Sequence, residues 1–397
     1  MILERIAYEH RARLVGALAR WCGDLQLAED GLADAVERAL GSWGTESPRD
    51  PVAWLITAAR NRIRDVLKAA ERTRTRGLDD DVPHPTVDAD PIRDDDTLAV
   101  LFACAHPALD RGVHAPLMLS AALGLPTADI ATAFALPVAT LSKRLVRAKQ
   151  KLRVNRASFE IPDDIPRERV GAVADAVYAA YAIEWLRIAP HDVVDLMTEH
   201  AIHASQLLLA ALPHDREVRG LAALLLYLHS RRDARIRDGM LVPLPDQDSA
   251  LWDPRLLRAA ERTLRRNASR TDLFSSGPYE LQAAIQSAHA GHAPPLAIAS
   301  LYDALVRTTS SRGAAVARAA AVARAQDPET GLRLLDSLRA GDVRFDAFQP
   351  YWAVRAELLR RNGAQDECRA ALRRAIDLCT NPPSRRYLQT KLERLAQ

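Results

Sequence analysis

One short acidic segment separates two groups of predicted helices in the chain. The stretch LDDDVPHPTVDADPIRDDD holds eight Asp, one Arg and three Pro. Clustered like charges and proline both oppose packing into a core, so residues 77–94 are expected to form an exposed, flexible acidic linker. On both sides of it apolar residues return at helical spacing, and aromatic residues make up only 5%. The sequence therefore predicts an all-α protein with several domains in its 397 residues.

A basic helix is predicted directly before the linker. Asp50 can cap it, and Pro51 suits its first turn. The segment from Val52 to Arg76 holds seven Arg or Lys and two acidic residues, a local net charge of +5. Basic residues recur at every fourth position and should share one face of the helix. They are Arg60, Arg64, Lys68 and Arg72.

A second basic helix is predicted beyond the linker, as the second helix of a helix-turn-helix. Thr127 can cap the first helix, TADIATAFAL, and Leu136-Pro137 provides the break between the two. Between Thr140 and Arg156 there are seven Arg or Lys and no acid, a local net charge of +7. A recognition helix of this kind directs its cations at the phosphates of DNA. Its apolar stripe should be buried and consists of Leu141, Leu145, Ala148 and Leu152.

Catalytic, metal and membrane motifs are missing from the sequence. It contains no glycine-rich phosphate loop, no GxSxG and no HExxH, so no enzyme and no cofactor are predicted. The four cysteines form no CxxC pair and are expected to be reduced core thiols. Cys104, His106 and His114 lie close together but lack a fourth ligand, so no metal is predicted. No run of 18 apolar residues and no signal-peptide core is present, so the chain is expected to be cytoplasmic, without a membrane partner.

Several segments together resemble extracytoplasmic-function sigma factors, a branch of the sigma-70 family. LAEDGLADAVERALGSW followed by PVAWLITAARNRIRDVLK resembles region two, and TADIATAFALPVATLSKRLVRAKQKLR resembles region four. One subgroup carries a long C-terminal extension, which is similar to DDDTLAVLFACAHPAL, DGMLVPLPDQDSALWD, GPYELQAAIQSAHA and the tetratricopeptide-like end YWAVRAELLRRNGAQDECRAALRRAIDLCTNP. Ala105 stands where that subgroup usually has a second cysteine.

The resemblance implies five parts. They are region two (1–76), the acidic linker (77–94), region four (95–156), a helical extension domain (160–300) and a tetratricopeptide-like helical domain (301–397).

The resemblance also implies partners and contact residues. The implied partners are core RNA polymerase and promoter DNA, and an anti-sigma or other regulatory protein is a further candidate partner. Polymerase docking is implied for Asp30, Asp34, Val36 and Arg38. Contact with the melted minus-ten element is implied for Trp54, Arg60, Asn61, Arg62, Arg64, Asp65 and Lys68. Contact with the minus-thirty-five element is implied for Thr140, Ser142, Lys143, Arg144, Arg147, Lys149 and Lys151.

Three other functions stay open on the sequence. A stand-alone helix-turn-helix regulator with a helical sensing domain would bind duplex DNA without polymerase. A tetratricopeptide-type scaffold with merely solubilising basic faces would show no salt-dependent DNA affinity. A hydrolase in the C-terminal half would need a catalytic constellation that the sequence does not display.

Overall fold

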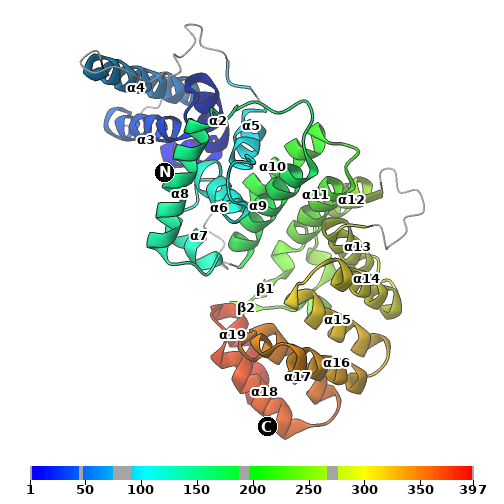
Figure 1. Cartoon of the computed structure of the whole chain (residues 1–397). Helices are drawn as coiled ribbons and strands as arrows, with labels where there is room; N and C mark the ends of the chain where they lie inside the picture. Colours follow the sequence, from blue (N-terminus) through cyan, green and yellow to red (C-terminus); the bar gives the residue numbers. More distant parts are fainter. Residues whose placement is uncertain are drawn as a thin grey trace. The chain divides into compact units, whose positions relative to one another are not determined.

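The computed structural model is almost entirely helical (Figure 1), which confirms the all-α prediction. It describes residues 2–43, 48–74, 91–93, 95–186, 196–265 and 276–395. Apart from residues 91–93, the predicted linker lies outside these segments. The chain forms two compact units, the first Met1–Trp185 with Pro190–Ala210 and the second Leu186–Ala189 with Ala211–Gln397. Within the described segments, no helix has both the length and the apolarity needed to cross a lipid bilayer.

The first unit opens with four helices whose starts follow local capping chemistry. They are α1 (Ile2–Glu9), α2 (Arg11–Cys22), α3 (Leu25–Ser42) and α4 (Pro51–Arg74). The Asp24 carboxylate accepts hydrogen bonds from the first free backbone N–H groups of α3, at 2.8 and 3.1 Å. Asp50 does the same for α4, accepting from the Ala53 N–H at 2.9 Å, so its predicted capping role is confirmed.

Six further helices complete the first unit. They are α5 (Asp96–Cys104), α6 (Arg111–Ala121), α7 (Thr127–Ala133), α8 (Val138–Val154), α9 (Arg167–Leu186) and α10 (Leu196–Ala211). The prediction that Thr127 caps α7 is wrong, because Thr127 is already helical and Pro126 occupies the cap position without a side-chain hydrogen bond. Arg169 of α9 donates to the Phe102 carbonyl at 2.6 Å, and the compact unit continues past the boundary expected at residue 160.

A buried ion pair joins α2 to α5. Every residue of α5 is buried, and α5 packs along α2. Arg20 donates to the Asp96 carboxylate from Nε at 2.8 Å and from Nη2 at 3.3 Å, with the two side chains only 8% and 1% exposed. Gly16 permits the close approach, since a Cβ there would lie 2.1 Å from the Asp96 carbonyl oxygen. The helix that follows the linker is thereby fixed to the helices that precede it.

The second unit is a succession of helices with one short hairpin. The helices are α11 (Arg216–His229), α12 (Pro254–Arg265), α13 (Pro278–Ala290), α14 (Pro295–Thr308), α15 (Arg312–Ala325), α16 (Pro328–Gly341), α17 (Gln349–Arg361), α18 (Gln365–Asp377) and α19 (Pro382–Arg394). From α13 to α19 each helix packs against the next (Figure 1). Stacking of sequence neighbours is typical of helical repeats. The tetratricopeptide-like assignment of residues 301–397 stays a prediction.

The segment DGMLVPLPDQDSALWD forms the hairpin and the connection that follows it. Strands β1 (Ile236–Arg237) and β2 (Met240–Leu241) pair antiparallel around Asp238 and Gly239, whose φ angles of 53° and 70° suit a tight hairpin turn. The Gly239 carbonyl accepts a hydrogen bond from Arg386 of α19 at 3.4 Å. Farther on, the Trp252 ring lies 5.7 Å beneath the Arg231 guanidinium. This segment connects helices within the second unit.

The segment GPYELQAAIQSAHA brings α13 against α11. A Cβ at Gly220 of α11 would lie 2.4 Å from the Glu280 nitrogen, so only glycine fits there. The Glu217 carboxylate accepts hydrogen bonds from the Tyr279 and Glu280 N–H groups, both at 3.0 Å, and caps α13. Burial raises the pKa of Glu217. At the other end of α13, burial and the charges of Arg231 and Arg324 lower the pKa of His289 to about 4.

Candidate nucleic-acid interface

The exposed side of α4 carries most of the residues predicted to meet the minus-ten element. Asn61, Arg62, Asp65 and Lys68 are exposed, while Arg64 is half-buried. Arg64 donates to the Asn61 side-chain oxygen at 3.1 Å, which orders both groups on the helix surface. A cluster of amide, guanidinium and carboxylate groups on a rigid helix can hydrogen-bond both phosphates and base edges.

Three residues of the minus-ten set contact aromatic rings, and one of them, Arg64, lies 5.3 Å from the centre of the Trp21 ring. Arg60 is only 9% exposed, and its guanidinium lies 5.7 Å from the centre of the Trp21 ring. The prediction of one exposed basic face with a four-residue repeat is therefore wrong at Arg60, because the aromatic face of Trp21 stabilises the cation there. Trp54 is half-buried and packs edge-on against Trp43 with ring centres 5.4 Å apart.

The predicted polymerase-docking residues lie on α3, beside α4. Asp34 forms ion pairs with Arg38 at 2.9 Å and with Arg62 of α4 at 3.2 Å, so it joins the two helices. Asp30 is exposed and accepts a hydrogen bond from Gln26 at 2.8 Å, while Val36 is half-buried. The structure thus brings docking and minus-ten candidates together on one pair of helices.

The two helices predicted to form a helix-turn-helix are α7 and α8, which pack against each other, and the apolar stripe of α8 is buried as predicted. The side chains predicted to face DNA are exposed, except Lys149. They are Thr140, Ser142, Lys143, Arg144, Arg147 and Lys151.

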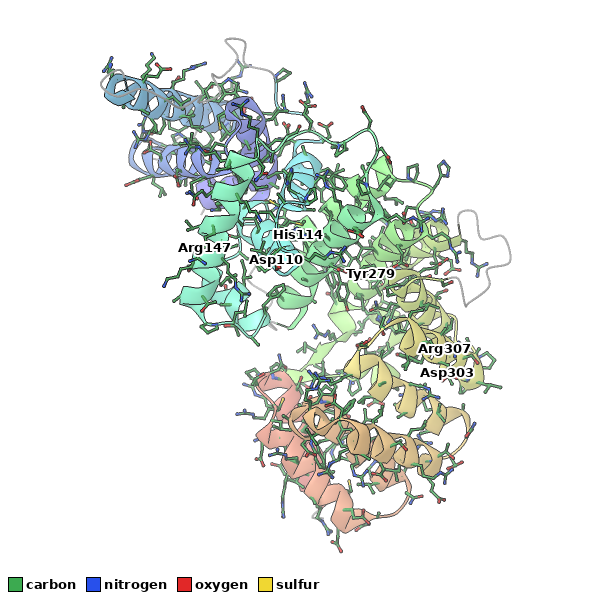
Figure 2. The ribbon with its side chains drawn as sticks, in the orientation of Figure 1. Asp110, His114, Arg147, Tyr279, Asp303 and Arg307 are labelled. Carbon is green, nitrogen blue, oxygen red and sulfur yellow. The ribbon has the colours of Figure 1, made fainter. Side chains whose placement is uncertain are left out.

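A hollow of about 350 Å³ lies between α8 and the start of α6 and is lined in part by Arg144, Arg147 and Lys151. Asp110, the cap of α6, lies at the same hollow (Figure 2). Three cations around one concave surface suit a phosphate group of a DNA backbone.

Lys149 departs from the other predicted minus-thirty-five residues. Its ammonium group lies 2.6 Å from the Glu29 carboxylate of α3, and the two side chains are 14% and 11% exposed. Arg153 of α8 pairs in the same way with Asp24 at 3.5 Å. Sequence reasoning missed Glu29 and Arg153, because nothing local shows that α8 packs against α3. These two ion pairs therefore hold the C-terminal end of α8 against the start of α3.

The predicted core thiols are confirmed, since all four cysteines are free and buried. Burial raises the pKa of Cys104 and lowers the pKa of His106 and of His114. His106 accepts a hydrogen bond from the Ala108 N–H at 3.1 Å and so shapes the loop after α5. Over the described segments, no group of three or more His, Cys, Asp or Glu side chains is placed to hold a metal ion.

Comparison with known proteins matches two segments of the chain to protein families. Residues 7–73 match sigma-70 region 2, the segment that contains α2, α3 and α4. Residues 169–268 match a family of unknown function (DUF6596). No solved structure gives a significant match to the chain.

The chain also has a relative along nearly its whole length. It is 35% identical over 408 residues to an uncharacterized protein of Rhizobium meliloti (strain 1021), covering 97% of this chain and 94% of that protein. The chain belongs to one family with that protein, and its N-terminal part carries a sigma-70 region 2 domain. A sigma-70 region 2 domain supports a sigma-factor-like role in transcription initiation and implies binding to core RNA polymerase.

Proposed function

We propose that the chain is a sigma factor of the extracytoplasmic-function type, which joins core RNA polymerase in the cytoplasm and directs it to specific promoters. The match of residues 7–73 to sigma-70 region 2 carries the proposal. The exposed groups on α4 and the helix-turn-helix of α7 and α8 support it. Polymerase performs all covalent chemistry.

The proposed division of labour follows the three helices. α3 docks on polymerase through Asp30, Asp34, Val36 and Arg38. α4 holds the melted minus-ten element, where unstacked bases are captured and the basic side chains follow the displaced strand. α8 enters the major groove of the minus-thirty-five element through its exposed half, from Thr140 to Arg147. Lys149 can join that contact only when it leaves Glu29.

The C-terminal extension is proposed to regulate or support activity, and an anti-sigma protein is a proposed regulatory partner. Most of the extension proposed from residue 160 onward, the part from α11 to α19, lies in the second compact unit. Its named segments are accounted for by helix packing, since DGMLVPLPDQDSALWD and GPYELQAAIQSAHA both serve contacts inside that unit. These observations favour a docking role over catalysis.

Transcription in vitro tests the proposal. Purified core polymerase and the full chain would be incubated with a pool of genomic fragments, and the RNA starts would be sequenced. We expect discrete starts that share two spaced upstream elements. The double variant Asn61→Ala/Lys68→Ala should lower promoter-specific transcription at least about tenfold, which corresponds to about 1.4 kcal/mol of lost contact.

The matched control is Glu329→Ala/Arg333→Ala, which removes an exposed ion pair from α16 and should leave transcription unchanged. A chain that fails to bind polymerase yet binds duplex DNA tightly would be a stand-alone helix-turn-helix regulator, and the proposal would be abandoned.

A further inference from the structure

We propose that α12, in the C-terminal extension, binds the phosphate backbone of duplex DNA through a stripe of arginines. The stripe consists of Arg255, Arg258, Arg262 and Arg265, and all four are exposed. At 3.6 residues per turn these positions fall within an arc of about 80° and extend over about 15 Å of the helix. The opposite face carries Leu257, Ala260 and Leu264 and packs on α11 and α13.

The positive charge of this stripe is left largely uncompensated. Glu261 is the one acidic residue of α12, and its carboxylate accepts hydrogen bonds from Tyr227 of α11 and from Ser287 of α13, the latter at 2.8 Å. Glu261 also pairs with Arg265, at the end of the stripe. Across the described segments, Arg255, Arg258 and Arg262 have no ion-pair partner. Arg258 and Arg262 therefore face solvent without a carboxylate, while Arg255 lies near the Asp253 carboxylate at the helix start without forming an ion pair with it.

Arginines elsewhere in the second unit are commonly neutralised. Ion pairs join Arg318 to Asp303, Arg333 to Glu329, Arg339 to Asp346, Arg344 to Asp342, Arg355 to Asp336, Arg360 to Glu357 and Arg369 to Asp366. Many arginines on the surface of this unit are thus paired with a nearby carboxylate. The stripe on α12 differs because its acidic neighbour, Glu261, is held by hydrogen bonds to α11 and α13.

A polyanion fits this surface better than an acidic protein does. The core of a protein interface is enriched in aromatic residues and methionine as well as arginine, whereas the stripe holds arginines with no aromatic anchor beside them. Duplex DNA presents about one negative charge per 1.7 Å of its axis, so a stripe about 15 Å long meets several phosphates. The planar fork of arginine also matches phosphate geometry in two hydrogen bonds. The inference rests on the proposed function, which brings the chain to promoter DNA.

The salt dependence of DNA binding tests the inference. The full chain and the triple variant Arg255→Gln/Arg258→Gln/Arg262→Gln would be titrated against a fluorescent duplex of arbitrary sequence between 50 and 200 mM salt, roughly the range in which phosphate contacts dominate. Each lost phosphate contact lowers the slope of log affinity against log salt by about 0.9, so we expect a decrease of about 3. The triple Arg→Lys variant should keep most of the slope, because it keeps the charge.

The control variant Arg333→Gln/Arg360→Gln/Arg369→Gln removes the same charge from arginines that are already paired. It should change the slope much less. Equal slopes in the two Gln variants would show an effect of net charge alone and would overturn the inference. Loss of binding to core polymerase with an unchanged DNA slope would also overturn it, in favour of an acidic protein surface.

Failure of the proposed function would look different. If the wild-type chain gave no promoter-specific transcription, while the stripe variant still lost duplex affinity, then the sigma-factor proposal would fall and the DNA-binding surface on α12 would stand.

Discussion

The buried pair between Arg20 and Asp96 offers the sharpest test of how the first unit is held together. The Asp96 carboxylate accepts two hydrogen bonds from Arg20 and a third from the Arg93 backbone N–H at 2.8 Å. The variant Asp96→Asn keeps the shape but removes the buried carboxylate charge that accepts two hydrogen bonds from Arg20. Breaking one partner of a buried pair costs about 3–5 kcal/mol. We expect the free energy that opposes separation of α2 from α5 to fall by about 3–5 kcal/mol.

Hydrogen exchange read by mass spectrometry measures this directly. A loss of about 3 kcal/mol is roughly a hundredfold faster exchange in peptides from α2 and α5, because 1.4 kcal/mol is a factor of ten. Peptides from α17 and α18, which lie in the other unit, should keep their rates. The control Glu329→Gln weakens a pair whose side chains are 70% and 62% exposed, and it should cost less than about 1 kcal/mol. Unchanged exchange in α2 and α5 of Asp96→Asn would refute the argument.

Two further predictions concern the second unit. Gly220→Ala should lower its melting temperature, because the new Cβ would lie 2.4 Å from the Glu280 nitrogen, whereas Gly313→Ala, in the exposed first turn of α15, should raise stability by up to about 1 kcal/mol. Calorimetry on both variants would check this, and equal effects would contradict the packing account. The pKa of His289 is lowered from 6.5 to about 4 in the folded chain, so the unfolded chain binds the proton first as pH falls. Stability present above pH 6.5 should therefore be lost toward pH 4, by up to about 3 kcal/mol at about 1.4 kcal/mol per pKa unit. His289→Gln should flatten that part of a denaturation profile, and an unaltered profile would count against a neutral buried imidazole.

Local patterns in the sequence were sufficient to predict that the chain is helical and to predict several details of its helices. The predicted cap Asp50 lies where its helix begins, because capping involves only the next few backbone N–H groups. The buried stripe of α8 follows from the helical period alone. Thr127 was an exception, since the preceding proline already sets the entry into α7.

Tertiary structure alone decided which charged groups are available to a partner. Arg60 and Lys149 look like exposed cations in the sequence, yet the first lies over Trp21 and the second pairs with Glu29. On α12 the opposite holds. Tyr227 and Ser287 donate hydrogen bonds to the Glu261 carboxylate, and arginines of the same helix remain facing solvent. Helical period gives the side of a helix on which a charge lies. Whether that charge meets a partner depends on residues distant in sequence, and only folding brings those residues together.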